Sequence, residues 1–301
     1  MPLDYRYYIS SIAAIFLALG IGIVIGGALM DNGEMGRSKE QLIVNLEQEF
    51  EQLRTEKRTL QAGIREREVE LEVLRQFNRE VVPLVVTGLL ANRKIGIVKT
   101  NQTIPADLTT DLMEILKLTG AQLLWSIELT GDPEPAVDQN ILAARLGLEN
   151  DLLGLNQLLT EFTDAVITGE DGELLAALHA NNLIQIRGET KESVKEPLDT
   201  LILLGGSYED KINFVDQIDL VVAKQAKLRG VIVAGVEPLT AKISYIPKYK
   251  KSGLIAIDNI NTLPGQVALI LALAGGEEGH YGVKETARSL LPKLSVQGLT
   301  Q

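Results

Sequence analysis

An uncharged apolar run near the amino terminus, Ile9 to Met30, constrains this chain more than any other feature. Its sequence is ISSIAAIFLALGIGIVIGGALM, in which the only side-chain hydroxyl groups belong to Ser10 and Ser11. A helix of this length reaches about 33 Å, enough to cross a hydrocarbon core of about 30 Å. The leader, residues 1–8, has one basic side chain, and the run is longer than a signal peptide requires. We therefore expect a retained transmembrane helix over residues 9–30, rather than a cleaved signal peptide or a buried core helix.

Small residues recur at every fourth position of this run, so they would form one ridge along the helix. The ridge consists of Ser10, Ala14, Ala18, Gly22 and Gly26. Ridges of this kind let two membrane helices approach closely, as in G-x-x-x-G pairs. The alternative is that glycine and alanine are simply frequent in membrane helices. We expect Ala14, Ala18, Gly22 and Gly26 to support self-association, with membrane lipid as the other partner of the helix.

Composition excludes several kinds of site and partner. Cysteine is absent from the 301 residues, so disulfides, thiolate metal ligands and cysteine nucleophiles are excluded. The formal net charge is −11, and an acidic chain lacks the basic surface that follows nucleic-acid phosphates. Aromatic residues make up only 4 %, which leaves few side chains for base stacking. We therefore expect no nucleic-acid partner.

Residues 37–82 form a charged stretch in which apolar residues recur at spacings of three and four. With Ile43 at heptad position a, the pattern predicts a coiled coil, because it continues beyond the three to four heptads usually required. The alternative is a single charged helix that lies on its own domain. Pro83 is expected to end the helix, since proline disfavours helical geometry in the residue before it. The seam consists of Ile43, Leu46, Phe50, Leu53, Lys57, Leu60, Ile64, Arg67, Leu71, Leu74, Asn78 and Val81.

The charges beside this seam favour a parallel pair of helices. Glu49 and Glu70 occupy g positions, and Arg54 and Arg75 occupy the following e positions, where a parallel partner would place opposite charges together. Asn78 falls at an a position, where a lone Asn tends to select a two-stranded coil. Two copies anchored in one membrane would also point the same way. We expect a dimeric stalk on the order of 60 Å long.

Beyond residue 84, short apolar runs alternate with helical patterns. This alternation predicts an α/β domain over 84–301 with a doubly wound, mostly parallel sheet, either Rossmann-like or flavodoxin-like. The expected strands are Arg93–Lys99, Ala121–Leu129, a short run within Asn182–Gly188, Thr200–Gly206, Gly230–Pro238 and, last, Leu254–Ile260. The expected helices are Pro105–Leu118, Ala136–Leu146, Asp151–Phe162, Gly172–Ala180, Asp210–Leu228 and Leu263–Ala274.

No assembled catalytic or metal site can be identified in this domain. The glycine fingerprint of dinucleotide sites follows none of the expected strands, and no P-loop motif occurs. His179 and His280 are far apart in sequence, and no metal-ligand spacing connects them. No nucleophile–base pair can be nominated. We therefore expect a domain that is not an enzyme and that has no resident cofactor.

The densest polar stretch follows the last expected strand. Ligands of open parallel sheets bind at the carboxyl ends of strands, and a strand delivers Asp258 and Asn259 there. The alternative is helix capping by Asn261 or Thr262. Residues 275–282 are expected to form a glycine-rich, mobile loop. The candidate ligand-binding residues are Gly205, Gly206, Asp258, Asn259, Thr262 and Tyr281, and the candidate metal ligand is His280.

Three stretches of this chain resemble the MctB family, the mycobacterial copper transport protein B family. They are SSIAAIFLALGIGIVIGGAL with the coiled-coil pattern after it, IDNINTLPGQVALILALAGG, and the segments HYG and ARSLLP. The resemblance covers both ends of the chain, and residues 100–192 add little to it. It implies a bacterial envelope protein in the cell membrane, with its amino terminus inside, its folded domain outside, and copper as cargo. SteB-like relatives imply instead a role in cell separation with a SteA-like partner.

Three functions remain open at this point. The resemblance favours copper transport or copper homeostasis, although no family copper-ligand motif maps onto residues of this chain. The anchor and stalk favour a non-catalytic scaffold for cell separation or envelope assembly. The sheet class favours a nucleotide- or small-ligand-binding sensor. Orientation is not settled by charge, because Arg6 on one side of the apolar run balances Arg37 and Lys39 on the other.

Overall fold

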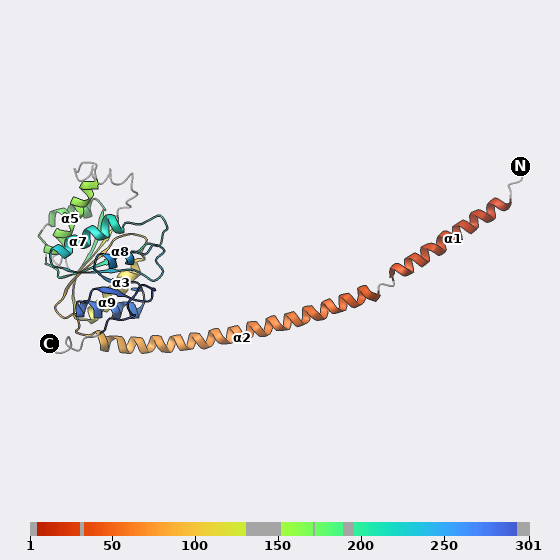
Figure 1. Ribbon diagram of the computed structural model, residues 1–301, viewed down its shortest axis with the longest axis horizontal. Helices are drawn as coiled ribbons and strands as arrows, with labels where there is room; N and C mark the ends of the chain where they lie inside the picture. Colours follow the sequence, from red (N-terminus) through yellow and green to blue (C-terminus); the bar gives the residue numbers. More distant parts are fainter. Residues whose placement is uncertain (1–4, 31–32, 131–151, 171, 189–195, 294–301) are drawn as a thin grey trace. The chain divides into compact units, whose positions relative to one another are not determined.

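The computed structural model describes residues 5–30, 33–130, 152–170, 172–188 and 196–293 (Figure 1). The chain divides into two units, Met1–Arg75 and Gln76–Gln301. The second unit contains the sheet and begins within the last turns of the long helix. The helix expected over Ala136–Leu146 lies outside the described residues.

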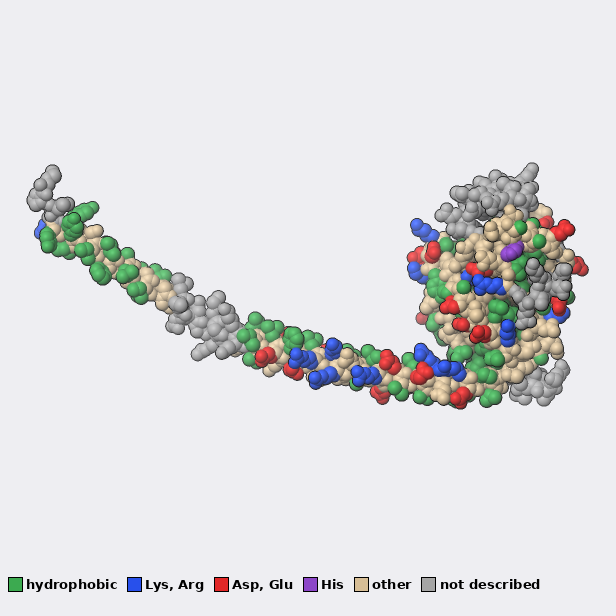
Figure 2. All heavy atoms as spheres, turned by 180° about the vertical axis from the view of Figure 1, so that it is seen from behind, with side chains coloured by type: hydrophobic (Ala, Val, Ile, Leu, Met, Phe, Trp, Pro, Cys, Tyr) green, Lys and Arg blue, Asp and Glu red, His purple; other side chains and the backbone are tan. Residues whose placement is uncertain are grey.

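Helix α1, Tyr5–Met30, confirms the expected apolar helix in the first unit. Its span Tyr5–Ala28 has a mean hydropathy of 2.5, and none of the span's most apolar window is buried by the rest of the chain. Figure 2 shows hydrophobic side chains along α1 with no charged ones among them beyond its amino-terminal end. By length and composition α1 can cross a membrane, as the sequence predicted.

Helix α2, Gly33–Val86, is 54 residues long and confirms that the charged stretch is helical. The apolar seam residues between Ile43 and Leu74 all lie at least half exposed. Arg54 pairs with Glu51 at 3.0 Å and Arg67 pairs with Glu70 at 2.7 Å, both within the helix. These pairs support an isolated helix only modestly. Arg54 also lies over the ring of the seam residue Phe50, at 5.8 Å. The pairing of α2 with a second copy stays a prediction.

The expected end of this helix at Pro83 was wrong, because α2 continues to Val86. Pro83 has no backbone N–H, so the helix loses one hydrogen bond there. This loss costs little in the final turn, where packing of the following residues keeps the backbone helical. Val86 is fully buried in the core of the second unit. Thr87 satisfies the Pro83 carbonyl oxygen through its backbone N–H at 3.1 Å and its hydroxyl group at 2.6 Å. Tertiary burial therefore extends the helix past the proline.

The second unit is built on a seven-stranded, mostly parallel sheet in the order β3-β2-β1-β4-β5-β6-β7. Six of the strands follow the 3-2-1-4-5-6 order of Rossmann-type sheets, with the reversal between β1 and β4. Only the pairing of β2 with β3 is antiparallel among the described strands. The strands are β1 Lys94–Lys99, β2 Gln122–Leu129, β3 Ile184–Gly188, β4 Thr200–Leu204, β5 Ile232–Val236, β6 Ile255–Ile257 and β7 Gly279–Tyr281.

Helices cover both faces of this sheet, which explains its continuous apolar strands. One core contains residues of α5, α6, α7 and α8, and the other contains residues of α3, α9 and the end of α2. Figure 1 shows α5 and α7 on one side and α3 and α9 on the other. The helices are α3 Ala106–Leu118, α5 Leu152–Thr168, α6 Gly172–Ala180, the π-helix η2 Val215–Asp219, α7 Leu220–Leu228, α8 Ile246–Lys251 and α9 Leu263–Gly275.

One predicted helix begins later than expected, and one short helix was not predicted. The helix expected over Asp210–Leu228 begins only at Val215, with the π-helical turn η2. The backbone N–H of Phe214 donates to the Tyr245 hydroxyl at 2.9 Å, a long-range bond that competes with helix formation before Val215. Helix α8 was missed, because six residues carry too little periodicity to identify it.

The last strand was also missed. The sequence predicted a mobile glycine-rich loop over residues 275–282 and placed the final strand at Leu254–Ile260. Instead, β7 pairs in parallel with β6, joining Ala256 to His280 and Ile257 to Tyr281. Three residues are too few to show an alternation pattern, and the flanking glycines resemble a loop.

Candidate functional site

The carboxyl edge of the sheet carries most of the predicted site residues. Gly205 and Gly206 follow β4, Glu237 follows β5, and Asp258 and Asn259 follow β6. Because these strands are parallel, their carboxyl ends meet at one edge, where open α/β sheets bind ligands. The predicted residues nevertheless fall into separate groups there.

Asp258 is fully buried at the end of β6 and has no free oxygen atom. Oδ1 accepts the backbone N–H of Val283 at 2.8 Å, and Oδ2 accepts that of Lys284 at 2.9 Å. His280 Nε2 lies 2.7 Å from the same Oδ2. Burial alone would raise the pKa of Asp258, but these hydrogen bonds outweigh it and lower the pKa. The carboxylate therefore anchors the chain after β7.

His280 lies in β7 and is also fully buried. Its Nε2 faces Asp258, and its Nδ1 lies 3.1 Å from the hydroxyl oxygen of Thr286. A metal ion at this ring would have to displace one of these two partners. Among the described residues, no group of three or more histidine and carboxylate side chains could hold a metal ion. The sequence offered Asp258 as a ligand-binding candidate and His280 as a metal candidate, and the structure places the two side chains in direct contact.

Thr262 and Asn259 lie together at the start of α9. The Thr262 hydroxyl oxygen accepts the backbone N–H of Gly265 at 3.2 Å and so caps the helix. Asn259 Nδ2 donates to the same oxygen at 3.1 Å. A Cβ atom at Gly265 would collide with the Asn259 carbonyl group, so this turn requires glycine there. The alternative reading of Thr262 as a helix cap is confirmed.

Gly205 and Gly206 line the point where the strand order reverses, between β1 and β4. This position is filled by the protein itself. A Cβ atom at Gly205 would collide with the hydroxyl group of Tyr249. Asn101 Nδ2 donates to the Gly206 carbonyl oxygen at 2.5 Å, and Gly206 has a φ of +81°, which favours glycine.

Asp219, which sequence reasoning missed, lies beneath these glycines and is fully buried. Its Oδ1 accepts the Thr100 hydroxyl at 3.0 Å and the Tyr249 hydroxyl, while its Oδ2 has no partner among the described residues. Burial raises the pKa of Asp219 to about 7, against the lowering effect of both hydroxyl groups. A carboxyl group directly before the apolar run Leu220–Val222 was the only sequence signal.

A second group of side chains that the sequence did not reveal connects the end of β5 with the chain after β7. Glu237 is fully buried and accepts the Ser244 hydroxyl at 2.6 Å and the Tyr245 backbone N–H at 2.6 Å. Lys284 Nζ forms an ion pair with Glu237 and donates to the Ser244 hydroxyl oxygen at 3.1 Å. We call residues 282–289 the C-terminal strap. The strap is held over this edge by Lys284 and by the backbone contacts to Asp258.

Tyr281 does not join the other predicted site residues. It is nearly buried in the core that contains α3 and α9, and its hydroxyl donates to Glu277 Oε2 at 3.3 Å. Burial, followed by the charge of Glu277, raises the pKa of Tyr281. Neighbouring residues of a strand point to opposite faces, which separates Tyr281 from His280.

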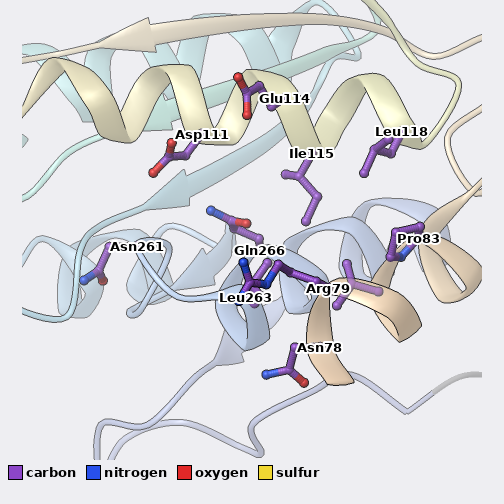
Figure 3. Close-up of a pocket in the computed structure, with 11 residues that line it drawn as sticks. Asn78, Arg79, Pro83, Asp111, Glu114, Ile115, Leu118, Asn261, Leu263 and Gln266 are labelled. Carbon is purple, nitrogen blue, oxygen red and sulfur yellow. The ribbon is translucent and has the colours of Figure 1, made fainter. Parts of the chain in front are cut away.

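A groove of about 480 Å³ lies elsewhere in the second unit, between α3 and the start of α9 (Figure 3). Its size is in the range of small-ligand sites. Sequence reasoning missed it, because α3 and α9 are separated by more than a hundred residues. The groove is lined by Asn78, Arg79, Val82 and Pro83 of α2, by Asp111, Glu114, Ile115 and Leu118 of α3, and by Asn261, Leu263 and Gln266.

Comparison with known proteins points to one family. A family model described as "Copper transport outer membrane protein, MctB" matches residues 3–292. Two similar proteins, from Mycobacterium bovis and from Mycobacterium tuberculosis strain H37Rv, are each named "Copper transporter MctB". Each is 23 % identical over 328 residues, which cover 96 % of this chain and 98 % of the relative.

Proposed function

Because this chain belongs to the MctB family, we propose that it is a non-catalytic, single-pass envelope protein that serves copper transport or copper homeostasis. The observation that carries this proposal is the family match, which spans α1, α2 and the whole sheet. The exposed, apolar α1 supports membrane anchoring. The family's name supplies the copper role, and the relatives' names agree with it.

In this proposal copper is the ion that the system transports, and the chain itself does not bind it. Copper favours thiolate, thioether and imidazole ligands. The sequence has no cysteine, and Met113, the one methionine of the sheet-containing unit, packs half-buried against an apolar core. Both ring nitrogens of His280 are engaged, and His179 Nδ1 lies 3.1 Å from the Ile184 carbonyl oxygen. The chain would therefore act on copper by holding other envelope components in place.

The proposed means of assembly is a parallel pair of α2 helices. The exposed seam from Ile43 to Leu74 offers an apolar surface that a second copy would cover. In a parallel pair, Glu49 would face Arg54 of the second copy, and Glu70 would face its Arg75. Asn78, which the sequence placed in this seam, is half-buried and lines the groove of the second unit. We therefore limit the proposed coil to residues 43–75.

Deletion of the gene tests the copper role. We expect a changed cellular copper content and a changed copper tolerance, both restored by the complete chain and not by a chain that lacks residues 9–30. Unchanged copper content and tolerance in the deletion strain would contradict the proposal. The purified chain should not retain Cu(I) against a competing chelator, because it has no thiolate and only four scattered thioether side chains.

A second candidate function is a scaffold for cell separation or envelope assembly, with a SteA-like partner. The exposed apolar seam of α2 favours it, since a scaffold needs a surface for self-association. Crosslinking in membranes should yield a dimer and co-purify a division or envelope protein. A deletion strain with normal copper handling and defective cell separation would favour this function over the first.

The third hypothesis, a nucleotide- or small-ligand-binding sensor, has less support. The strand ends where such ligands bind are occupied by Asp258, Glu237 and their protein partners. A thermal-shift screen of the full chain against nucleotides and metal ions should give no stabilisation. A reproducible rise in melting temperature with one nucleotide would restore this hypothesis.

We propose a cell-membrane location with the amino terminus inside and the sheet-containing unit outside. The cysteine-free sequence allows a direct test with single introduced cysteines. Cysteine at exposed Glu173 should react with a membrane-impermeant maleimide in intact cells, and cysteine at Tyr5 should react only after lysis. The reverse labelling pattern would invert the proposed topology.

A further inference from the structure

The groove between α3 and α9 has a polar interior, with Gln266 and Arg79 among its lining residues. Gln266 is 6 % exposed, and its side-chain amide makes no hydrogen bond to any described residue. Figure 3 shows this side chain beneath α3, next to Leu263 and Arg79, with its amide on the side of Asp111. The amide is not sealed from the groove, so it can bond a ligand or water there.

One wall of the groove is acidic. Asp111 and Glu114 are three residues apart on α3, so they lie on the same side of that helix. Both side chains are exposed, and neither forms a hydrogen bond or ion pair with any described residue. Two neighbouring carboxylates repel each other, and a cation between them would relieve this repulsion.

The remaining lining is apolar and elongated. Ile115 and Leu118 continue the same face of α3, and Leu263 lies across from them at the start of α9. From Asp111 to Leu118 the helix rises about 10 Å, which matches about three residues of an extended peptide. An amide such as Gln266 can donate to and accept from one peptide unit of such a segment.

We propose that this groove binds a short extended segment of a partner protein that carries a Lys or Arg side chain beside an apolar side chain. The basic group lies against Asp111 and Glu114, and the apolar side chain packs on Ile115, Leu118 and Leu263. Gln266 bonds the backbone of the segment. This site is independent of copper handling and of the pairing of α2.

Peptide display on the full-length protein in lipid nanodiscs tests the proposal. A library of random heptapeptides should yield sequences enriched in Lys or Arg next to an apolar residue. The double substitution Asp111→Asn with Glu114→Gln should weaken binding of the selected peptide at least tenfold. The matched control, Glu173→Gln with Glu285→Gln, removes two exposed carboxylates outside the groove and should leave binding unchanged.

A second pair of variants fills the groove without removing its charges. Leu118→Lys places an ammonium group four residues after Glu114, where it can pair with Glu114 and compete with the ligand. It should abolish peptide binding, whereas Leu228→Lys, at an exposed leucine outside the groove, should not. Enrichment of acidic or purely apolar peptides, or binding that survives both groove variants, would overturn the proposal. Failure to enrich any peptide would overturn it as well.

Discussion

Helix α2 and the carboxyl edge of the sheet place side chains in opposite environments. On α2, Phe50 and Leu53 are 62 % and 61 % exposed, although both are apolar. At the sheet edge, Glu237 and Asp258 are fully buried, although both are acidic. The buried carboxylates have their hydrogen-bond partners within the same chain. The apolar side chains of the seam from Ile43 to Leu74, in contrast, stay at least half exposed. The comparison indicates that the sheet edge is stabilised within the chain, whereas the exposed seam of α2 is the surface on which the proposed pairing would act.

The largest expected effect concerns Asp219, for one oxygen atom of whose buried carboxyl group the described part of the chain offers no partner. Its folded-state pKa is raised from 3.8 to about 7, so its contribution to stability is full below pH 3.8 and is lost as the pH rises to about 7. At about 1.4 kcal/mol per pH unit, the loss is on the order of 4 kcal/mol. Asp219→Asn should remove this loss, as measured by urea unfolding at pH 4 and pH 8. An identical pH dependence in the variant would contradict the assignment.

The next effect tests whether the strap depends on its ion pair. Lys284→Met leaves Glu237 buried without its cation and should lower the free energy of unfolding by roughly 3 kcal/mol. The double variant Glu237→Gln with Lys284→Met should recover most of this loss. Lys248→Met is the matched control, because its 2.9 Å pair with Asp216 is exposed and should contribute less than about 1 kcal/mol. Equal losses for Lys284→Met and Lys248→Met would remove the contrast.

A single acidic substitution tests whether α2 pairs through its exposed seam. Leu53→Glu should weaken dimerisation about 100-fold, or about 2.7 kcal/mol, because it places two carboxylates in the proposed interface. Val69→Glu is the control, since Val69 is 66 % exposed and lies at heptad position f, outside the seam. Sedimentation of the full chain in detergent measures both. Loss of the dimer in both variants, or in neither, would show that α2 does not pair through this seam.

The smallest effect concerns Asp258. Its folded-state pKa is lowered, so its contribution is present above the ordinary value of 3.8 and is lost as the pH falls through the lowered value. Asp258→Asn weakens the charge-assisted bonds from His280 and the strap and should destabilise the protein by about 1.5 kcal/mol at pH 7. The difference from the unchanged protein should shrink in strong acid. A constant difference at all pH values would indicate a packing effect instead.

Much of the layout was predictable because its signals are local. The apolar run of α1 and the periodicity of α2 each lie within one helix, so neighbouring residues reveal them. The six expected strands each show an apolar run, and the structure confirms all six with shifts of a few residues at their ends. The capping role of Thr262 was foreseen for the same reason, since cap and helix are adjacent.

The candidate site was less predictable, because its contacts join distant segments. Asp258 and His280 were both singled out, but their direct bond depends on the three-residue strand β7, which has no readable pattern. Glu237 and Lys284 are 47 residues apart. Nothing near either residue in the sequence indicates that they meet.

The sequence by itself determined that this chain has one helix able to cross a membrane, a long heptad-patterned helix and an α/β domain. Those features follow from the spacing of apolar residues along one segment, which acts through local geometry. Only the tertiary structure decided that helix α2 continues through Pro83, that the strand ends are filled by Asp219 and Glu237, and that α3 and α9 enclose a groove. These features depend on which distant segments share a core, and burial there outweighs local preference.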